Sequence, residues 1–225
     1  LGRYERAVIA RSMATIVSAR DDADHLGGSP VVVPNGVDLE QFGFRPAPRT
    51  EPVVVFAGNL GYFPNVDGAR LLADEVMPAL RRQVPAARLV IAGARPTRSV
   101  RRLAGADTAV LSEPDDLGAV VAAAAVAVVP VRAGTGIQNK VLEAMAVGTP
   151  VVTTQRAAAA IGAEDGVHLL VADGVEGTAA AAARILRDPD LAERLRRAAH
   201  SHVAERFTWE RAAMIVEQVW ERTAV

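Results

Sequence analysis

Two charged residues, Lys140 and Glu143, have the types and the spacing to bind a ligand, and they follow a loop with glycine at positions 134 and 136. Residues three apart share one face of a helix, so the ammonium and the carboxylate would face the same ligand. A glycine-flanked loop also leaves backbone amides and the positive end of the helix dipole open to an anion. An ammonium suits a phosphate, and a carboxylate can accept both hydrogen bonds of a ribose diol. A surface Lys–Glu pair would explain the charges but not the two glycines.

A second candidate is the turn at residues 58–61, which carries glycine at both ends and follows an apolar run at 53–57. Ligands of α/β proteins bind at the carboxyl ends of parallel strands, which is where this turn would lie. Glycines there would let the backbone approach a diphosphate closely. The alternative is an ordinary strand-to-helix turn with Asn65 as the helix cap.

Composition excludes several classes of function. The net charge of -1 gives no electrostatic reason to bind nucleic acid, and the absence of cysteine excludes disulfides and thiolate metal sites. Lys140 is the single lysine among 25 basic residues, which is chance or marks a site that needs a compact ammonium. The longest apolar run, residues 117–131, is too short to cross a bilayer, so we expect a soluble, cytoplasmic protein.

The elements that would position these residues alternate between short apolar runs and helical patterns. Strands are predicted at residues 15–18, 31–33, 53–57, 88–92, 108–111, 126–130, 150–153 and 168–171. Continuous apolar strands are typical of a parallel sheet covered on both faces, so the predicted fold is a doubly wound, Rossmann-like α/β domain. Helices are predicted at residues 66–84 and 98–103, and three more after residue 171, separated at Asp188 and Thr208, which are the expected N-caps.

Some polar and aromatic residues are predicted to have no role in a site. His200 and His202 are two apart, so they cannot chelate a metal together and are expected to be solvated. The arginines at 194, 196 and 197 are interpreted as a solvated helix face, which leaves open a use against anionic lipid. Trp209 and Trp220 are interpreted as packing residues.

The run 140–152, Lys-Val-Leu-Glu-Ala-Met-Ala-Val-Gly-Thr-Pro-Val-Val, resembles the signature of the family 4 retaining glycosyltransferases, which have the GT-B fold. Residues 33–38 and 56–60 resemble two further motifs of that family, in the same order and at the same spacing. The resemblance implies that the carboxyl-terminal domain holds a nucleoside-diphosphate sugar and that an amino-terminal domain closes over it with the acceptor. It also implies that Glu143 binds the ribose, that Lys140 binds the phosphates, and that Leu117 lies near the base.

The donor-binding residues predicted in this way are Gly58, Asn59, Leu60, Gly61, Glu113, Leu117, Gly134, Thr135, Gly136, Ile137, Lys140 and Glu143. No catalytic residue is identified, and no metal or other cofactor is expected. The chain departs from the family at Thr135, where members commonly carry a glutamate that contacts the sugar. It also lacks the basic pair that many members place after the first-strand glycine, so the identity of the sugar stays open.

The resemblance implies four segments: a remnant of an acceptor domain at 1–30, an interdomain linker with a first strand at 31–52, a donor domain at 53–207 and a crossover helix at 208–225. The alternative for residues 1–30 is an N-terminal extension of the donor domain itself. Without the upstream domain the chain should bind the donor but not transfer sugar. Its terminal segments would then expose apolar side chains that a partner or a second copy could cover; these are Tyr4, Val8, Trp209, Ile215 and Trp220.

The implied function is retaining transfer of a hexosyl group from a UDP- or GDP-type sugar to a glycan, lipid or small-molecule acceptor. Cell-surface polysaccharide synthesis in the cytoplasm fits this function, and contact with the inner face of the plasma membrane stays open. Two alternatives remain, a nucleotide-sugar epimerase of the same fold and a non-catalytic nucleotide-binding module.

Overall fold

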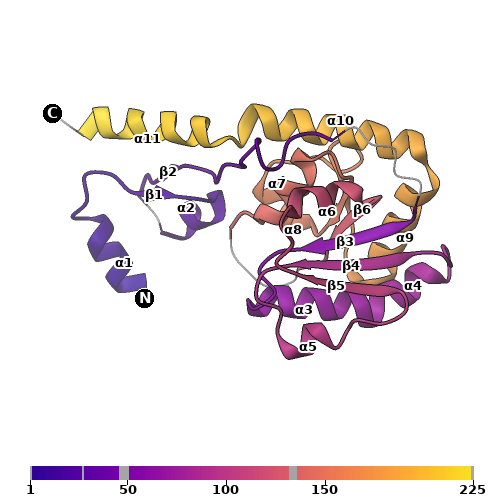
Figure 1. Ribbon diagram of the computed structural model, residues 1–225. Coiled ribbons are helices and arrows are strands. Elements are labelled where there is room, and N and C mark those ends of the chain that lie inside the picture. Colours follow the sequence, from indigo (N-terminus) through magenta and orange to yellow (C-terminus); the bar gives the residue numbers. More distant parts are fainter. Residues whose placement is uncertain (1, 27, 46–50, 132–135, 224–225) are drawn as a thin grey trace.

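A six-stranded parallel sheet forms the centre of the computed structural model, which describes residues 2–26, 28–45, 51–131 and 136–223 (Figure 1). Its strand order is β5-β4-β3-β6-β7-β8. The strands are β3 (Val53–Ala57), β4 (Arg88–Gly93), β5 (Thr108–Ser112), β6 (Val126–Val129), β7 (Val151–Thr153) and β8 (Leu170–Val171). The order places β3 and β6, which are far apart in sequence, side by side, so the predicted doubly wound α/β fold is confirmed.

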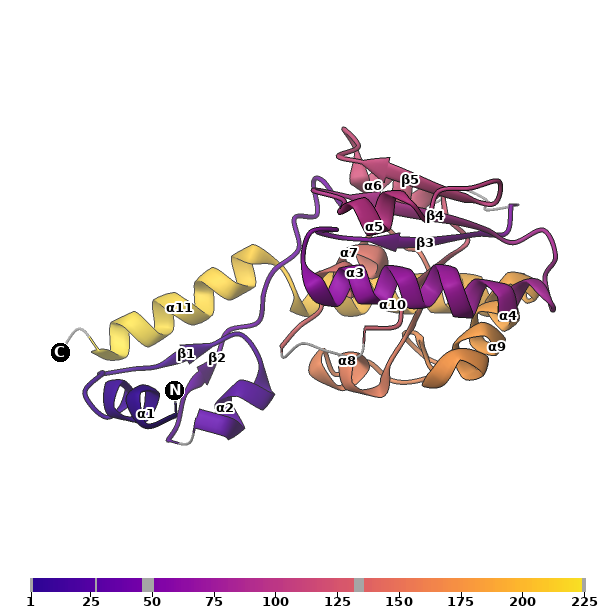
Figure 2. The same cartoon turned by 90° about the horizontal axis from the view of Figure 1, so that it is seen from below.

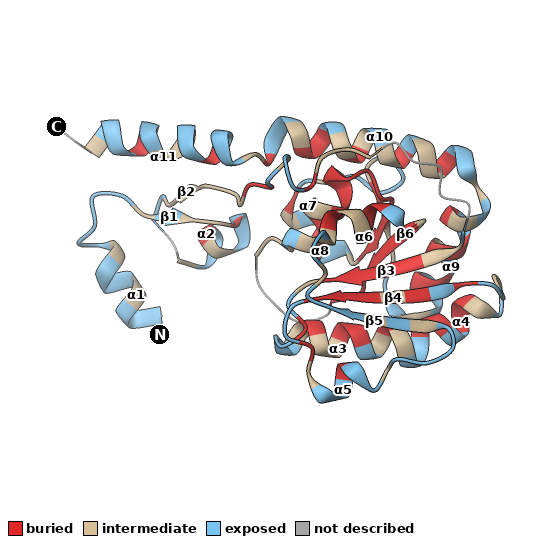
Figure 3. Cartoon of the chain, in the orientation of Figure 1, coloured by how far each residue is buried: buried red, intermediate tan, exposed pale blue. Residues whose placement is uncertain are grey.

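Helices cover both faces of this sheet. One face carries α3 (Phe63–Leu71), η1 (Leu72–Val76), α4 (Met77–Arg81), α5 (Arg98–Arg101) and α9 (Gly174–Arg187). The other carries α6 (Leu117–Ala123), α7 (Asn139–Ala146) and α10 (Pro189–Arg206), and α8 (Gln155–Ala160) follows β7. Strands β3 and β6 are almost entirely buried between the two layers (Figure 3). This burial explains why their sequences are apolar without alternation.

The helix predicted at 66–84 is one continuous helical stretch over α3, η1 and α4, and it begins at Phe63. Its π-helical part, η1, ends with the amide of Met77 donating to the carbonyl of Leu72, five residues back. Pro78 follows directly and has no N–H to donate, so the widened turn absorbs a break in the usual hydrogen-bond pattern. The predicted caps Asp188 and Thr208 are confirmed, because each side chain accepts a backbone amide three residues on.

A small amino-terminal unit lies beside the sheet domain (Figure 2). It contains α1 (Gly2–Ile9), β1 (Ile16–Val17), α2 (Arg20–Leu26) and β2 (Val31–Val32). Strand β2 pairs with β1 in a separate parallel pair, and therefore not with the large sheet. The prediction placed this strand with the linker at residues 31–52, whereas β2 belongs structurally to the amino-terminal unit that precedes the linker. Helix α11 (Trp209–Thr223) leaves the sheet domain after Phe207 and lies along this unit (Figures 1 and 2).

Helix α10 corrects part of the prediction that its histidines and arginines are solvated: Arg194 and Arg197 are exposed as expected, but His202 and Arg196 are not. His202 is buried, and its Nε2 lies 2.9 Å from the carbonyl oxygen of Ile161. The side chain of Arg196 is 12% exposed and donates to the carbonyls of Gly148 and Arg45. These two side chains face the sheet domain because α10 packs against α7, a contact that helical periodicity alone does not reveal.

The tryptophans were also predicted wrongly as packing residues. Trp209 is 53% exposed and Trp220 is 72% exposed, both on α11. Tyr4 and Val8 on α1 are exposed as well, whereas Ile215 is partly buried. The separate prediction that the terminal segments expose apolar side chains holds for Tyr4, Val8, Trp209 and Trp220, and not for Ile215.

Candidate functional site

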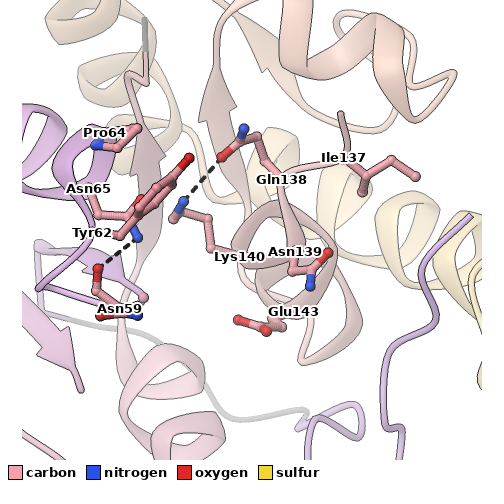
Figure 4. Close-up of a pocket in the computed structure, with 10 residues that line it drawn as sticks. Asn59, Tyr62, Pro64, Asn65, Ile137, Gln138, Asn139, Lys140 and Glu143 are labelled. Atoms are coloured by element: carbon pink, nitrogen blue, oxygen red, sulfur yellow. Dashed lines mark hydrogen bonds between the residues drawn. The ribbon is translucent and has the colours of Figure 1, made fainter. Parts of the chain in front are cut away.

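A cleft of about 350 Å³ opens at the carboxyl ends of β3 and β6, between the turn after β3 and the start of α7 (Figure 4). Its lining consists of Gly58, Asn59, Tyr62, Pro64, Asn65, Ile137, Gln138, Asn139, Lys140 and Glu143. The two walls come from motifs about 80 residues apart in the sequence, which the neighbouring positions of β3 and β6 bring together. The cleft is therefore a product of the sheet order.

The turn after β3 is held by hydrogen bonds to the turn after β4. The amide of Gly58 donates to the carbonyl of Ala92 at 3.1 Å, and the amide of Leu60 donates to that of Ala94 at 2.7 Å. The amide of Gly61 donates to the Asn59 side chain at 3.1 Å. These three amides have partners within the protein, and close approach of a diphosphate to the turn stays a prediction.

Glycine is required in these two turns for packing. A Cβ on Gly93 would lie 1.9 Å from the carbonyl oxygen of Gly58, and both residues have a φ of 144°, which side chains disfavour. A Cβ on Gly58 would lie 3.1 Å from Cε of Lys140 and 3.2 Å from Nδ2 of Asn65. The glycines thus let the two turns and the Lys140 side chain lie close together.

Lys140 projects from the first turn of α7 into the cleft. Its Nζ donates to Oε1 of Gln138 at 3.2 Å and lies 5.9 Å from the centre of the Phe56 ring. Burial lowers the pKa of the Lys140 ammonium to about 8, and nearby Glu143 offsets part of this effect. Asn139 and Lys140 begin the helix, where backbone amides lack acceptors within the helix. A positive charge and a helix N-terminus therefore face the same space, which favours an anion.

Glu143 lies one helical turn further along α7 and also lines the cleft. Burial raises the pKa of its carboxyl, and Lys140 acts in the opposite direction. Figure 4 shows Asn59, Lys140 and Glu143 directed toward the same opening. The predicted pairing of these charges on one face of a helix is thus present, and the pair lines a cleft instead of a solvated surface.

The structure brings together only part of the predicted donor-binding set. The predicted residues that line the cleft are Gly58, Asn59, Ile137, Lys140 and Glu143. Those that do not line it are Leu60, Gly61, Glu113, Leu117 and Gly136. Leu60 is fully buried in the core, because the turn directs its side chain inward. Gly134 and Thr135 lie outside the described residues.

The segment predicted to lie beside the base follows the edge strand β5 and leads into α6, which packs against α7. Glu113 has a φ of 48°, unusual for a residue with a side chain, and its amide donates to the carbonyl of Gly93. Asp116 caps α6 through the amide of Ala119 and pairs with Arg45 at 3.0 Å. The amide of Ala119 and the Arg45 guanidinium lower the pKa of the Asp116 carboxyl. The linker at Arg45 is thus tied to this segment.

Sequence reasoning missed several lining residues, namely Tyr62, Pro64, Asn65, Gln138 and Asn139. Asn65 is buried inside α3, where its Nδ2 donates to the Asn59 carbonyl, so it is not a helix cap. Asn139 accepts a hydrogen bond from Asn35 of the linker at 3.0 Å. The available signal was proximity to the two motifs, since each missed residue lies within a few positions of Gly58 or Lys140.

Within residues 2–26, 28–45, 51–131 and 136–223, no group of three or more His, Cys, Asp or Glu side chains could hold a metal ion. No helix in the same part of the chain has both the length and the apolar character needed to span a membrane.

Comparison with known proteins identifies the family of this fold and site. A family model described as "Glycosyl transferases group 1" matches residues 51–188, which include both walls of the cleft. The chain is 28% identical over 232 residues to a phosphatidyl-myo-inositol mannosyltransferase of Mycobacterium leprae, covering 98% of the chain and 61% of that protein. It is 32% identical over 207 residues to a glycogen synthase of Mycobacterium tuberculosis, covering 84% of the chain and 47% of that protein. The chain therefore spans roughly half to three fifths of these relatives.

The fold is also found in solved structures. Anabaena HepE in complex with UDP superposes with a TM-score of 0.81 at 18% identity, covering 99% of this chain and 67% of that one. The same protein has been solved in complex with UDP-glucose.

Proposed function

Because the chain belongs to the group 1 glycosyl transferases, we propose that the protein transfers a sugar from a nucleoside diphosphate to an acceptor and that the cleft between β3 and α7 holds the donor. The observation that carries the proposal is the Lys140–Glu143 pair, which lines a cleft at the carboxyl ends of β3 and β6. The named relatives are a mannosyltransferase and a glycogen synthase, and HepE has been solved with UDP. The HepE complexes with UDP and with UDP-glucose support a nucleoside-diphosphate sugar as the donor.

Each charged group has a distinct role in the proposed complex. The Lys140 ammonium and the first turn of α7 neutralise the diphosphate, and they also stabilise the charge that develops when the bond to the anomeric carbon breaks. The Glu143 carboxylate accepts hydrogen bonds from the two ribose hydroxyls. Both groups are on one rigid helix, so the spacing between the ribose-binding group and the diphosphate-binding group is set before the donor binds.

The reaction is proposed to retain the anomeric configuration and to need no metal, as the family resemblance implies. The donor base is uracil or guanine, and the acceptor is a glycan, lipid or small molecule. The segment at Glu113 and Leu117 is proposed to approach the base from the β5 side. Gly134, Thr135 and Gly136 are proposed to contribute to binding of the diphosphate and sugar, as the family resemblance implies.

Titration calorimetry of the 225-residue chain with UDP, GDP, UDP-glucose and GDP-mannose tests this proposal. We expect one base to bind more tightly, and we expect Lys140→Met to weaken the nucleoside diphosphate far more than the parent nucleoside. Glu217→Ala, an exposed change on α11, is the matched control and should leave binding unchanged. Failure of every nucleotide to bind, or equal losses for nucleoside and diphosphate in Lys140→Met, would contradict the proposal.

A further inference from the structure

Tyr62 is an aromatic residue that lines the cleft and yet remains 57% exposed. Neither of the two charged roles proposed above involves it. Figure 4 shows its ring beside Asn65 and across from Lys140 and Gln138, with the hydroxyl end directed toward Gln138. Aromatic side chains in a ligand cleft supply flat apolar area beside polar groups, which is the usual composition of a binding site.

The backbone holds Tyr62 in a fixed position at the start of α3. Its amide donates to the carbonyl of Asn59 at 3.1 Å, and its carbonyl accepts the amides of Asn65 at 2.9 Å and Val66 at 3.0 Å. Pro64 in the first helical turn restricts the backbone further. The backbone of Tyr62 is therefore already ordered, and only the rotation of its side chain is lost when a ligand binds against the ring.

The neighbouring Phe63 provides an internal comparison. Phe63 is 73% exposed and is the first residue of α3, whereas Tyr62 is the N-cap of that helix. The two aromatic residues are therefore neighbours in the chain and both are exposed, but only Tyr62 lines the cleft.

The order of groups along α7 gives the direction of the ligand. Three helical residues correspond to a rise of about 4.5 Å, so the ribose at Glu143 and the diphosphate at Lys140 define an axis that points to the N-terminal end of α7. Continuing along this axis, the next residues lining the cleft are Asn139, Gln138 and Ile137, with Tyr62 on the opposite wall. The sugar attached to the diphosphate would lie there.

We propose that Tyr62 is a sugar-contacting residue whose ring packs against the C–H face of the hexosyl group of the donor. This inference rests on the proposed function. A hexose has C–H groups on its faces and hydroxyls at its edges, so a flat ring on one side and a polar side chain, Gln138, on the other match both parts. Tyr62 thereby contributes to the recognition of the sugar and leaves the nucleotide to Lys140 and Glu143.

The test is the ratio of the affinity for a nucleotide sugar to the affinity for its nucleotide. It is measured by calorimetry on the whole chain with UDP-glucose and UDP, and with GDP-mannose and GDP. Loss of this apolar contact predicts that Tyr62→Ala lowers the ratio roughly two- to tenfold for the preferred base. Tyr62→Phe should keep most of the ratio, and Phe63→Ala should keep all of it. Circular dichroism and thermal unfolding verify that each variant is folded.

The outcomes separate the two proposals. Unchanged nucleotide affinity with a reduced ratio in Tyr62→Ala supports the sugar contact. Equal changes for nucleotide and nucleotide sugar, or the same loss in Phe63→Ala, would overturn it while leaving nucleotide binding in place. If UDP, GDP and their sugars all fail to bind the unmodified chain, the proposed function fails, and the sugar contact fails with it.

Discussion

Nucleoside-diphosphate binding should weaken as the pH rises through the titration of Lys140. Burial lowers the pKa of this ammonium to about 8 in the unliganded protein. A diphosphate next to it would raise that pKa, because an opposite charge favours the protonated form. The complex therefore holds a proton that the free protein loses as the pH increases, and binding becomes linked to proton uptake.

The size of this effect follows from the free-state pKa. With a pKa of about 8, the protonated fraction of Lys140 falls from about nine tenths at pH 7 to about one tenth at pH 9. If the liganded pKa lies well above 9, the association constant should fall about tenfold over this interval, or about 1.4 kcal/mol. A lysine with its ordinary pKa of 10.5 would give almost no change over the same range.

The assay is calorimetry with UDP or GDP, whichever binds, at several pH values between 7 and 9. Lys140→Arg should flatten the profile because a guanidinium stays charged throughout, and its planar shape should restore affinity only in part. Lys140→Met should also be flat, at lower affinity. Any pH dependence that comes from Glu143 is still present in Lys140→Met, so subtracting the profile of this variant from that of the unmodified chain isolates the part due to Lys140. A flat profile for the unmodified chain, or an equal slope in Lys140→Met, would refute the assignment.

Three further predictions concern single residues. Glu143→Ala should lower diphosphate affinity about tenfold or more, since a charge-assisted hydrogen bond contributes on the order of 1.5 to 3 kcal/mol, and unchanged calorimetric affinity would remove the ribose role. Gly148→Ala should lower the free energy of unfolding in urea by about 2 to 4 kcal/mol, because φ is 76° and the new Cβ would lie 2.4 Å from the Phe44 ring. The control is Gly166→Ala, where φ is 73° but the space is open, and it should lower that free energy by about 1 kcal/mol. Equal losses in the two variants would contradict the packing argument. Burial lowers the pKa of His202 below 6.5, so the free energy of unfolding should decrease as the pH falls through about 6.5 and below, and His202→Gln should reduce this decrease; an unchanged acid dependence would exclude the residue.

The secondary structure was predictable because apolar periodicity reports burial directly. Strands β3 and β6 lie between two helical layers, and continuous runs of Val, Ala and Phe are required there. The pairing of β1 with β2 was not predictable, because strands of two residues carry no pattern and their register depends on the surrounding unit. The start of α3 was placed late because Phe63 and Pro64 look like turn residues, although proline fits the first turn of a helix.

The charged side chains of α10 show a second limit of sequence reasoning. A helix with few apolar residues suggests a solvated surface, but Arg196 and His202 both reach backbone carbonyls of the sheet domain. Long side chains can cover apolar surface and still satisfy their polar ends, so their burial depends on which carbonyls lie nearby. That information exists only once α10 has packed against α7.

The glycines of the candidate site located the cleft from the sequence, but the sequence did not reveal their role in packing. Gly58 is predicted to let the backbone approach a diphosphate, and the structure adds a second reason for glycine, because its missing Cβ makes room for Lys140. A side chain at position 58 would displace that ammonium, so Gly58→Ala should weaken diphosphate binding through Lys140. The double variant Gly58→Ala/Lys140→Met tests whether the two residues act together in diphosphate binding. If the losses in binding free energy of the two single variants do not add in the double variant, both changes act through Lys140. Additive losses would indicate that Gly58 contacts the ligand independently.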